Sequence, residues 1–248
     1  MDRSHASCIF RSMAYELHYW PTIQGRGEYV RLALEDAAIP YRDVARGKDG
    51  DEKLSKELDD RRMEHPPFAP PFLKAGKLVI GQTANILLFL GERHELAPKS
   101  DAGRFWTHQL QLTIADLVAE IHDSHHPIAS GLYYEDQQKE AAKRAKDLRE
   151  NRLPKYLGYF DRVLKKNGTG WLVGRSRTYA DLSLFQIVEG LRYAYPVATK
   201  KLERKFPSLT ELRDRVAARP NIAVYLKSER RIPFTREGIF RHYPELDG

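Results

Sequence analysis

Cysteine is almost absent from this chain of 248 residues, since Cys8 is the only one. A single cysteine excludes an internal disulfide framework and a zinc site built from cysteines. It fits a reducing compartment, and we therefore expect a cytoplasmic protein. Residues 1–14, which contain Cys8, are too short and too weakly apolar for a signal peptide, and we expect them to form a disordered leader.

Long hydrophobic runs are also missing. No stretch of about 18 apolar residues is present that could span a bilayer, so we expect no membrane segment. The hydrophobic fraction of 42% is that of an ordinary globular protein. A chain of this length can bury a full core, and two domains are the natural expectation.

Acidic residues are in the minority, which gives a formal charge of +7. Such a charge suits nucleic acid, an acidic membrane surface or small anionic ligands. The basic residues, however, are interleaved with acids along helical-looking segments, as on a solvated face. Without a recognition motif or an aromatic and basic stripe, we expect no nucleic-acid partner.

The first half of the chain mixes strand and helix patterns. Residues 15–19 alternate as a strand does, and a glycine-containing loop leads from them into a helical segment. A second strand is predicted at 41–45, followed by a polar stretch, 46–64, with room for a short irregular helix. The proline-rich run 65–81 predicts a hairpin, and a further helix follows it. The order βαβαββα indicates an α/β domain over 15–95 with a mixed four-stranded sheet.

The second half shows no competing strand pattern. Segments 103–130, 136–166, 178–195 and 207–227 all have helical spacing, which predicts an all-α domain over 101–230. The domain boundary is expected within 94–101, where Pro98 interrupts the helical pattern. The tail, 231–248, has no periodicity, and we expect it to wrap the surface or cover a binding site.

This order of elements resembles the cytosolic glutathione S-transferase superfamily over residues 15–230, and in particular its tyrosine-type members of the sigma, pi and mu classes. The resemblance implies a thioredoxin-like amino-terminal domain that binds glutathione and a helical domain that accepts a hydrophobic electrophile. It also implies a homodimer, with glutathione as co-substrate and no metal. Gln109 lies near the position from which the neighbouring subunit supplies an acid in the pi class, so that contact is altered or absent.

The first supporting motif is the strand end followed by a Gly-Arg-Gly turn. In this resemblance Tyr19 takes the place of the catalytic tyrosine. One extra residue separates it from the turn, which leaves Thr22 as a rival donor. Arg26 would add positive potential near the sulfur and Trp20 would pack on glutathione, although a solvated cation and a domain-interface anchor are the alternative roles.

The second motif is Pro70-Pro71 before the hairpin, which resembles the family's cis-proline stretch. The residue before the cis proline pairs with the cysteinyl backbone of glutathione in the family. Because Pro70 has no N–H, only its carbonyl group can take that role. A lysine of the preceding loop would bind the glycine carboxylate, and Lys48 and Lys53 are both candidates.

The third and fourth motifs mark the starts of two helices. Gln82 and Thr83 resemble the signature that begins the third helix. There free N–H groups and the Thr83 hydroxyl suit the γ-glutamyl carboxylate, and Gln82 would hold the α-amino side. Thr178 and Asp181 resemble the buried capping box of the second domain, with Arg177 in place of the usual apolar residue.

These residues predict an enzyme that activates the thiol of glutathione through Tyr19 for conjugation or peroxide reduction. The alternative is a non-catalytic binding or structural module on the same fold. Two minor alternatives are a metal site at His122, His125 and His126, and a thiol transferase using Cys8. We expect no metal site, since no carboxylate-histidine motif accompanies the histidines. We expect no thiol transferase, since Cys8 lies outside the segment of strand, turn and helix that forms the site.

Overall fold

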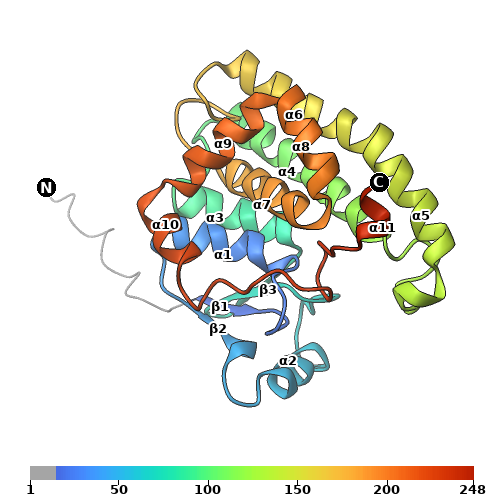
Figure 1. The fold of residues 1–248 in the computed structure, drawn as a ribbon. Helices are drawn as coiled ribbons and strands as arrows, with labels where there is room; N and C mark the ends of the chain where they lie inside the picture. The colour runs from blue at the N-terminus through green and yellow to red at the C-terminus, as the bar shows by residue number, and fades with distance from the viewer. Residues whose placement is uncertain (1–14) are drawn as a thin grey trace, which may run out of the picture.

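The computed structural model describes residues 15–248, and a four-stranded mixed sheet forms the base of its first half (Figure 1). The strands, in the order β2-β1-β3-β4 across the sheet, are β1 (Tyr15–His18), β2 (Tyr41–Asp43), β3 (Phe72–Ala75) and β4 (Leu78–Gly81). Strand β1 pairs in parallel with β2 and antiparallel with β3, which pairs antiparallel with β4. The mixed sheet predicted from the sequence is confirmed.

Three helices cover the two faces of this sheet. They are α1 (Gly27–Asp36), α2 (Gly50–Leu58) and α3 (Thr83–Arg93). Because side chains alternate along a strand, Leu17 and His18 of β1 point to opposite faces. Leu17 joins Leu73 in the large core with α1 and α3. The ring of His18 stacks on Phe72, with centroids 4.4 Å apart, on the face that α2 covers with Leu54.

Only helices and turns follow residue 81 in the described chain. The helices of the second half are α4 (Asp101–Asp123), α5 (Gln138–Asp147), α6 (Leu153–Asn167), α7 (Tyr179–Ala194), α8 (Pro196–Lys205), α9 (Pro207–Ala217) and α10 (Pro220–Leu226). Short helical turns lie at Val44–Arg46 and Tyr134–Asp136, and a π-helical turn, Leu148–Arg152, joins α5 to α6. Thirteen residues of α7 are buried, because this helix packs against α4, α9 and α1 at once.

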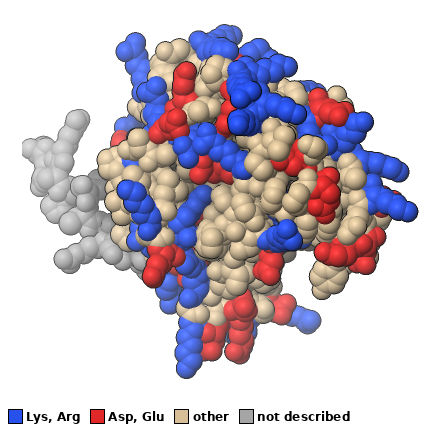
Figure 2. Space-filling model, in the orientation of Figure 1, with Lys and Arg blue, Asp and Glu red and all other residues tan. Residues whose placement is uncertain are grey.

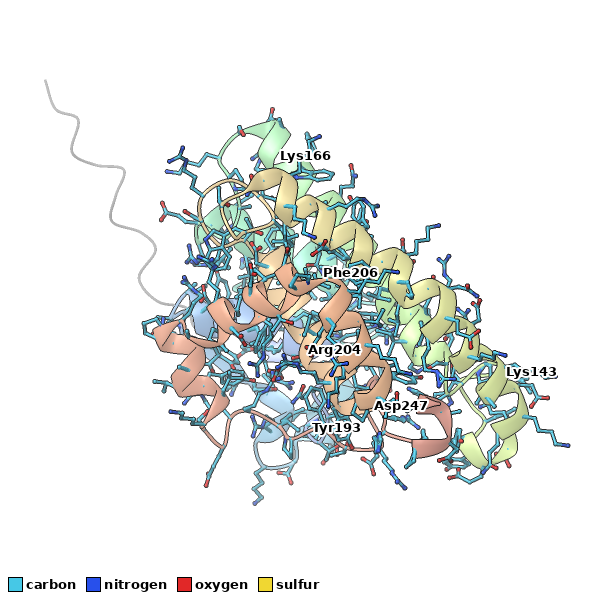
Figure 3. The ribbon with its side chains drawn as sticks, turned by 45° about the horizontal axis from the view of Figure 1, so that its top comes forward. Lys143, Lys166, Tyr193, Arg204, Phe206 and Asp247 are labelled. Atoms are coloured by element: carbon cyan, nitrogen blue, oxygen red, sulfur yellow. The ribbon has the colours of Figure 1, made fainter. Side chains whose placement is uncertain are left out.

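The tail is packed into the molecule. After α10 the chain crosses the front of the view and ends in the short helix α11 (Pro244–Asp247) beside α5 (Figure 1). Phe234 stacks on Tyr193 of α7 with ring centroids 5.1 Å apart. The carboxylate of Asp247, labelled in Figure 3, accepts the backbone N–H groups of Val197 and Ala198 at 2.7 and 3.1 Å. The tail therefore caps the start of α8.

The surface is basic but mixed. Figure 2 shows lysine and arginine side chains spread over one face, with acidic side chains between them. Within residues 15–248, none of the helices has the length and apolar character that crossing a bilayer requires.

Candidate active site

Tyr19 is the first residue after β1 and is held against the turn that leads into α1. Its side chain is buried, and its hydroxyl oxygen accepts the backbone N–H of Arg26 at 2.8 Å. This bond occupies the oxygen as an acceptor and leaves the O–H proton available. Tyr19 is therefore oriented as a hydrogen-bond donor at the end of the central strand.

Two glycines make room for the Tyr19 ring. A Cβ atom at Gly25 would lie 2.0 Å from the Tyr19 hydroxyl oxygen, and one at Gly27 would lie 2.5 Å from its ring carbon Cδ1. Gly25 also has a positive φ of 44°, which glycine adopts more easily than other residues. The glycine turn is thus required by the position of Tyr19.

Burial raises the pKa of Tyr19, and the Arg26 amide and the nearby Arg26 and Arg31 charges only partly oppose it. The phenol accordingly stays protonated at neutral pH. A protonated phenol beside positive charge can donate a hydrogen bond to an anion.

The rival donor and the aromatic neighbour are more exposed than Tyr19. Thr22 is exposed, and Trp20 has a relative exposure of 39%. The Trp20 side chain is therefore partly accessible from solvent.

The residues predicted to bind glutathione before β3 and at the start of α3 have distinctive backbone geometry, and Thr83 contacts the turn that contains Arg26. The Pro70–Pro71 peptide bond is cis, as the sequence predicts. Gln82 precedes α3 with φ 68° and ψ 120°, a region that non-glycine residues seldom occupy and that costs about 1–3 kcal/mol. The Thr83 hydroxyl donates to the Arg26 carbonyl oxygen at 3.3 Å, which joins the start of α3 to the turn.

A cavity of about 290 Å³ opens beside this junction. It is bounded by the start of α3, by Arg26 and Tyr29 of the turn and α1, and by one face of α4. The structure therefore brings Arg26 to the same cavity as Gln82 and Thr83, although Thr83 is 57 residues away from Arg26 in the sequence.

Lys48 and Lys53, the candidates for binding the glycine carboxylate, do not line this cavity. Lys53 donates to the carbonyl oxygen of Lys48 at 2.7 Å, and both are exposed. A hollow of about 580 Å³ near them is lined instead by Arg46 together with Pro21 and the start of α2. The Arg46 guanidinium also donates to the Glu229 carbonyl oxygen at 2.9 Å. Sequence reasoning missed Arg46, because its contacts are with the segment after α10, more than 180 residues away in the sequence.

A buried network of charged residues on α1 supports the turn before this helix, where Arg31 donates to the Gln24 carbonyl oxygen at 3.3 Å. Arg31 and Glu28 of α1 are fully buried and lie 3.3 Å apart, and Arg31 also binds Asp43 at 2.7 Å. Tyr225 of α10 donates to Glu28 at 2.6 Å, and Arg231 of the tail pairs with the same carboxylate. The only sign of this network in the sequence is the pair Glu28 and Arg31, two opposite charges three residues apart within an apolar helix.

The capping box of α7 is confirmed. Asp181 accepts the Thr178 amide and hydroxyl groups and the Leu172 amide, each at 2.7 Å. Burial raises the pKa of Asp181 to about 6 against these hydrogen bonds. Arg177, in place of an apolar staple residue, binds the buried carboxylate of Asp36 on α1 at 2.9 Å.

The three histidines form a ring cluster at the end of α4. The His125 ring lies 5.4 Å from that of His122 and 4.8 Å from that of His126. His125 is paired with the Ile239 carbonyl oxygen at 2.8 Å, and burial lowers its pKa to about 3. Among residues 15–248 no group of histidine, cysteine and acidic side chains is arranged to hold a metal ion. Cys8 lies outside the described residues.

Known proteins share this architecture. A family model described as glutathione S-transferase, C-terminal domain, matches residues 122–229. The chain is 29% identical to glutathione S-transferase P 1 of Xenopus laevis over 222 residues, which cover 88% of this chain and 93% of that protein. It is 26% identical to a glutathione S-transferase of Plasmodium falciparum, with 86% of this chain and 95% of the relative covered.

Solved structures give the same result for the fold. A Pi-class glutathione S-transferase of Onchocerca volvulus superimposes with a TM-score of 0.68 at 23% identity, covering 87% of this chain and 93% of that one. Prostaglandin synthase D of Nilaparvata lugens superimposes with a TM-score of 0.69 at 19% identity, covering 89% and 100%. In its fold, its matched domain and its relatives, the chain is similar to the cytosolic glutathione S-transferases.

Proposed function

We propose that this glutathione transferase activates its co-substrate through Tyr19, whose hydroxyl donates a hydrogen bond to the glutathione thiolate. The observation that carries the proposal is the buried Tyr19 phenol, fixed at the end of β1 by the Arg26 N–H at 2.8 Å. Its oxygen is occupied as an acceptor, so its proton is available for donation to a ligand.

The energy required is within reach of one hydrogen bond. A cysteine thiol has a pKa near ~8.5, so only a few per cent is thiolate at neutral pH. Lowering that pKa by about two units requires stabilising the anion by roughly 2.7 kcal/mol. A hydrogen bond to a charged group supplies about 1.5–3 kcal/mol. Arg26 adds positive potential nearby.

Glutathione is proposed to lie along the elements that surround Tyr19. The free N–H groups at the start of α3, with Gln82 and Thr83, suit the γ-glutamyl carboxylate. The Pro70 carbonyl group suits the cysteinyl N–H. The glycine carboxylate suits the basic side chains near the hollow, namely Lys48, Lys53 and Arg46.

The electrophile is proposed to be a small hydrophobic molecule bound between Trp20 and α4. The thiolate sulfur attacks its electrophilic carbon, a C–S bond forms, and the leaving group or the adjacent π-bond takes the electron pair. With a peroxide, the same thiolate attacks one oxygen, the O–O bond breaks and an alcohol is released. A second glutathione then converts the resulting glutathione sulfenic acid to glutathione disulfide and water.

Tyr19→Phe tests the proposal against the rival donor and against a binding module. We expect kcat/KM for conjugation to fall at least about tenfold, since one positioned donor contributes more than about 1.4 kcal/mol. Thr22→Val is the matched control and should change kcat/KM little. The reverse pattern would assign the role to Thr22. Glutathione binding without turnover of any electrophile or peroxide would instead indicate a non-catalytic module.

We also propose a homodimer in the cytoplasm, as is typical of this superfamily. Light scattering should give twice the mass of one chain, 28.7 kDa. A mass equal to one chain across the micromolar range would contradict the dimer and leave the role of Tyr19 unaffected.

A further inference from the structure

The cavity between α3 and α4 has two chemically different ends. One end is formed by Gln82, Thr83 and Ala84 at the start of α3, where free N–H groups and the positive end of the helix dipole favour an anion. The other end is formed by residues of α4 spaced by three, four and seven positions, His108, Gln111, Leu112 and Ala115.

Polar atoms at the α4 end lack partners. Within residues 15–248, the side-chain oxygen Oε1 of Gln111 and Nδ1 of His108 are buried and form no hydrogen bond. Tyr29 also lines the cavity, and its hydroxyl group is likewise buried and forms no hydrogen bond within the described chain. Gln111 and Tyr29 have relative exposures of only 1% and 2%.

Such atoms carry a cost in the free protein. A buried polar atom without a partner destabilises the free protein, and a ligand that supplies the partner recovers that free energy. Burial lowers the pKa of His108, so its ring is neutral at pH 7 and one nitrogen can accept. The Gln111 oxygen is an acceptor in any case. Both groups therefore favour a ligand that donates hydrogen bonds.

An α-amino acid end group has matching chemistry. Its carboxylate needs N–H donors, and its ammonium needs acceptors a short distance away. We infer that Gln111 and His108 of α4 recognise the γ-glutamyl amino group of glutathione from within the same chain, while α3 holds the carboxylate. This inference rests on the proposed function, because it assumes that glutathione is the ligand. The side chains turn from their covered positions toward the ammonium on binding.

The test compares glutathione with N-glutaryl-cysteinylglycine, the same peptide with hydrogen in place of the α-amino group. Calorimetric titration at pH 7 gives the ratio of the two dissociation constants. Wild-type protein should bind glutathione about tenfold or more tightly, as expected for a charge-assisted hydrogen bond. In Gln111→Leu the ratio should fall close to one, and His108→Leu should lower it in the same direction.

Two further variants separate recognition from a folding defect. Gln111→Glu adds a charged acceptor at the same place and should raise the ratio. Thr113→Val is the matched control, because the Thr113 hydroxyl on the same helix donates only to the Gln109 carbonyl oxygen and Thr113 does not line the cavity. It should leave the ratio unchanged.

The possible failures are distinguishable. An unchanged ratio in Gln111→Leu and Gln111→Glu, or its loss in Thr113→Val, would overturn the assignment to the cavity face of α4 while glutathione still binds. Failure of both peptides to bind the wild-type protein would contradict the proposed function itself, and this inference with it.

Discussion

At the scale of single residues, the position of the Tyr19 hydroxyl depends on the absence of side chains around it. The ring lies against Gly25 and Gly27, and the hydroxyl is fixed by the Arg26 amide. A shift of about 1 Å in a catalytic group can reduce the rate about a hundredfold. The turn is therefore as important for activity as the tyrosine.

Gly25→Ala tests this dependence. The added Cβ would lie 2.0 Å from the Tyr19 hydroxyl oxygen, so the ring must move and kcat/KM should fall about a hundredfold. Gly174→Ala is the matched control. Gly174 has φ 62° but nothing within 4 Å of the added Cβ, so only about 1–2 kcal/mol of stability should be lost. Equal kcat/KM in the two variants would contradict the packing role of Gly25.

The sequence predicts some residues of the candidate site and misses others for a physical reason. Tyr19 and the cis bond at Pro71 belong to local patterns of strand, turn and proline, which neighbouring residues determine. Arg46 and Gln111 belong to no local pattern. Arg46 is held beside its hollow by the Glu229 carbonyl oxygen after α10. Gln111 is distinguished only by its unpaired side-chain oxygen on the face of α4 that lines the cavity.

At the scale of elements, the start of α7 depends on one carboxylate. Asp181 accepts hydrogen bonds from Leu172 and Thr178, so it fixes both the helix and the loop before it. Because α7 is the central helix of the second half, its first turn sets the position of its neighbours.

Asp181→Ala should lower the free energy of unfolding by about 2–4 kcal/mol, because two buried N–H groups lose their acceptor. Urea denaturation measures the change. Asp116→Ala, which removes an exposed acid from α4, should change it by less than about 0.5 kcal/mol. A similar small loss in both variants would show that the capping box contributes little.

The order of strands and helices follows from hydrophobic periodicity, which explains why the sequence predicts it well. The boundaries are less predictable. The segment predicted as one helix over 136–166 is divided by the π-helical turn Leu148–Arg152. Pro154 stands two residues after this turn. Because a proline has no N–H to donate to the carbonyl group four residues earlier, here that of Glu150, the regular α-helical pattern is interrupted within the turn.

At the scale of the whole molecule, a buried carboxylate joins the two halves of the chain. The side chain of Asp36 on α1 is fully buried and is paired with Arg177 and Arg219. Asn221 donates to the Asp36 carbonyl oxygen at 3.0 Å. The two arginines are 141 and 183 residues away in the sequence, so no local pattern could predict these pairs.

Asp36→Ala should lower the free energy of unfolding by about 3–5 kcal/mol, because it leaves two arginines without their counter-charge. Lys56→Ala breaks the exposed pair with Glu52 and should cost no more than about 0.5 kcal/mol. Urea denaturation of both variants checks the difference. If both cost the same small amount, the Asp36 contacts do not hold the halves together.

The central claim is that Tyr19 activates the thiol, and the ultraviolet absorbance of the thiolate tests it most directly. Glutathione bound to wild-type protein and to Tyr19→Phe is titrated across pH. We predict a bound thiol pKa well below ~8.5 in the wild type that returns toward that value in Tyr19→Phe. A pKa that is unshifted in both proteins, or lowered equally in both, would contradict the role of Tyr19.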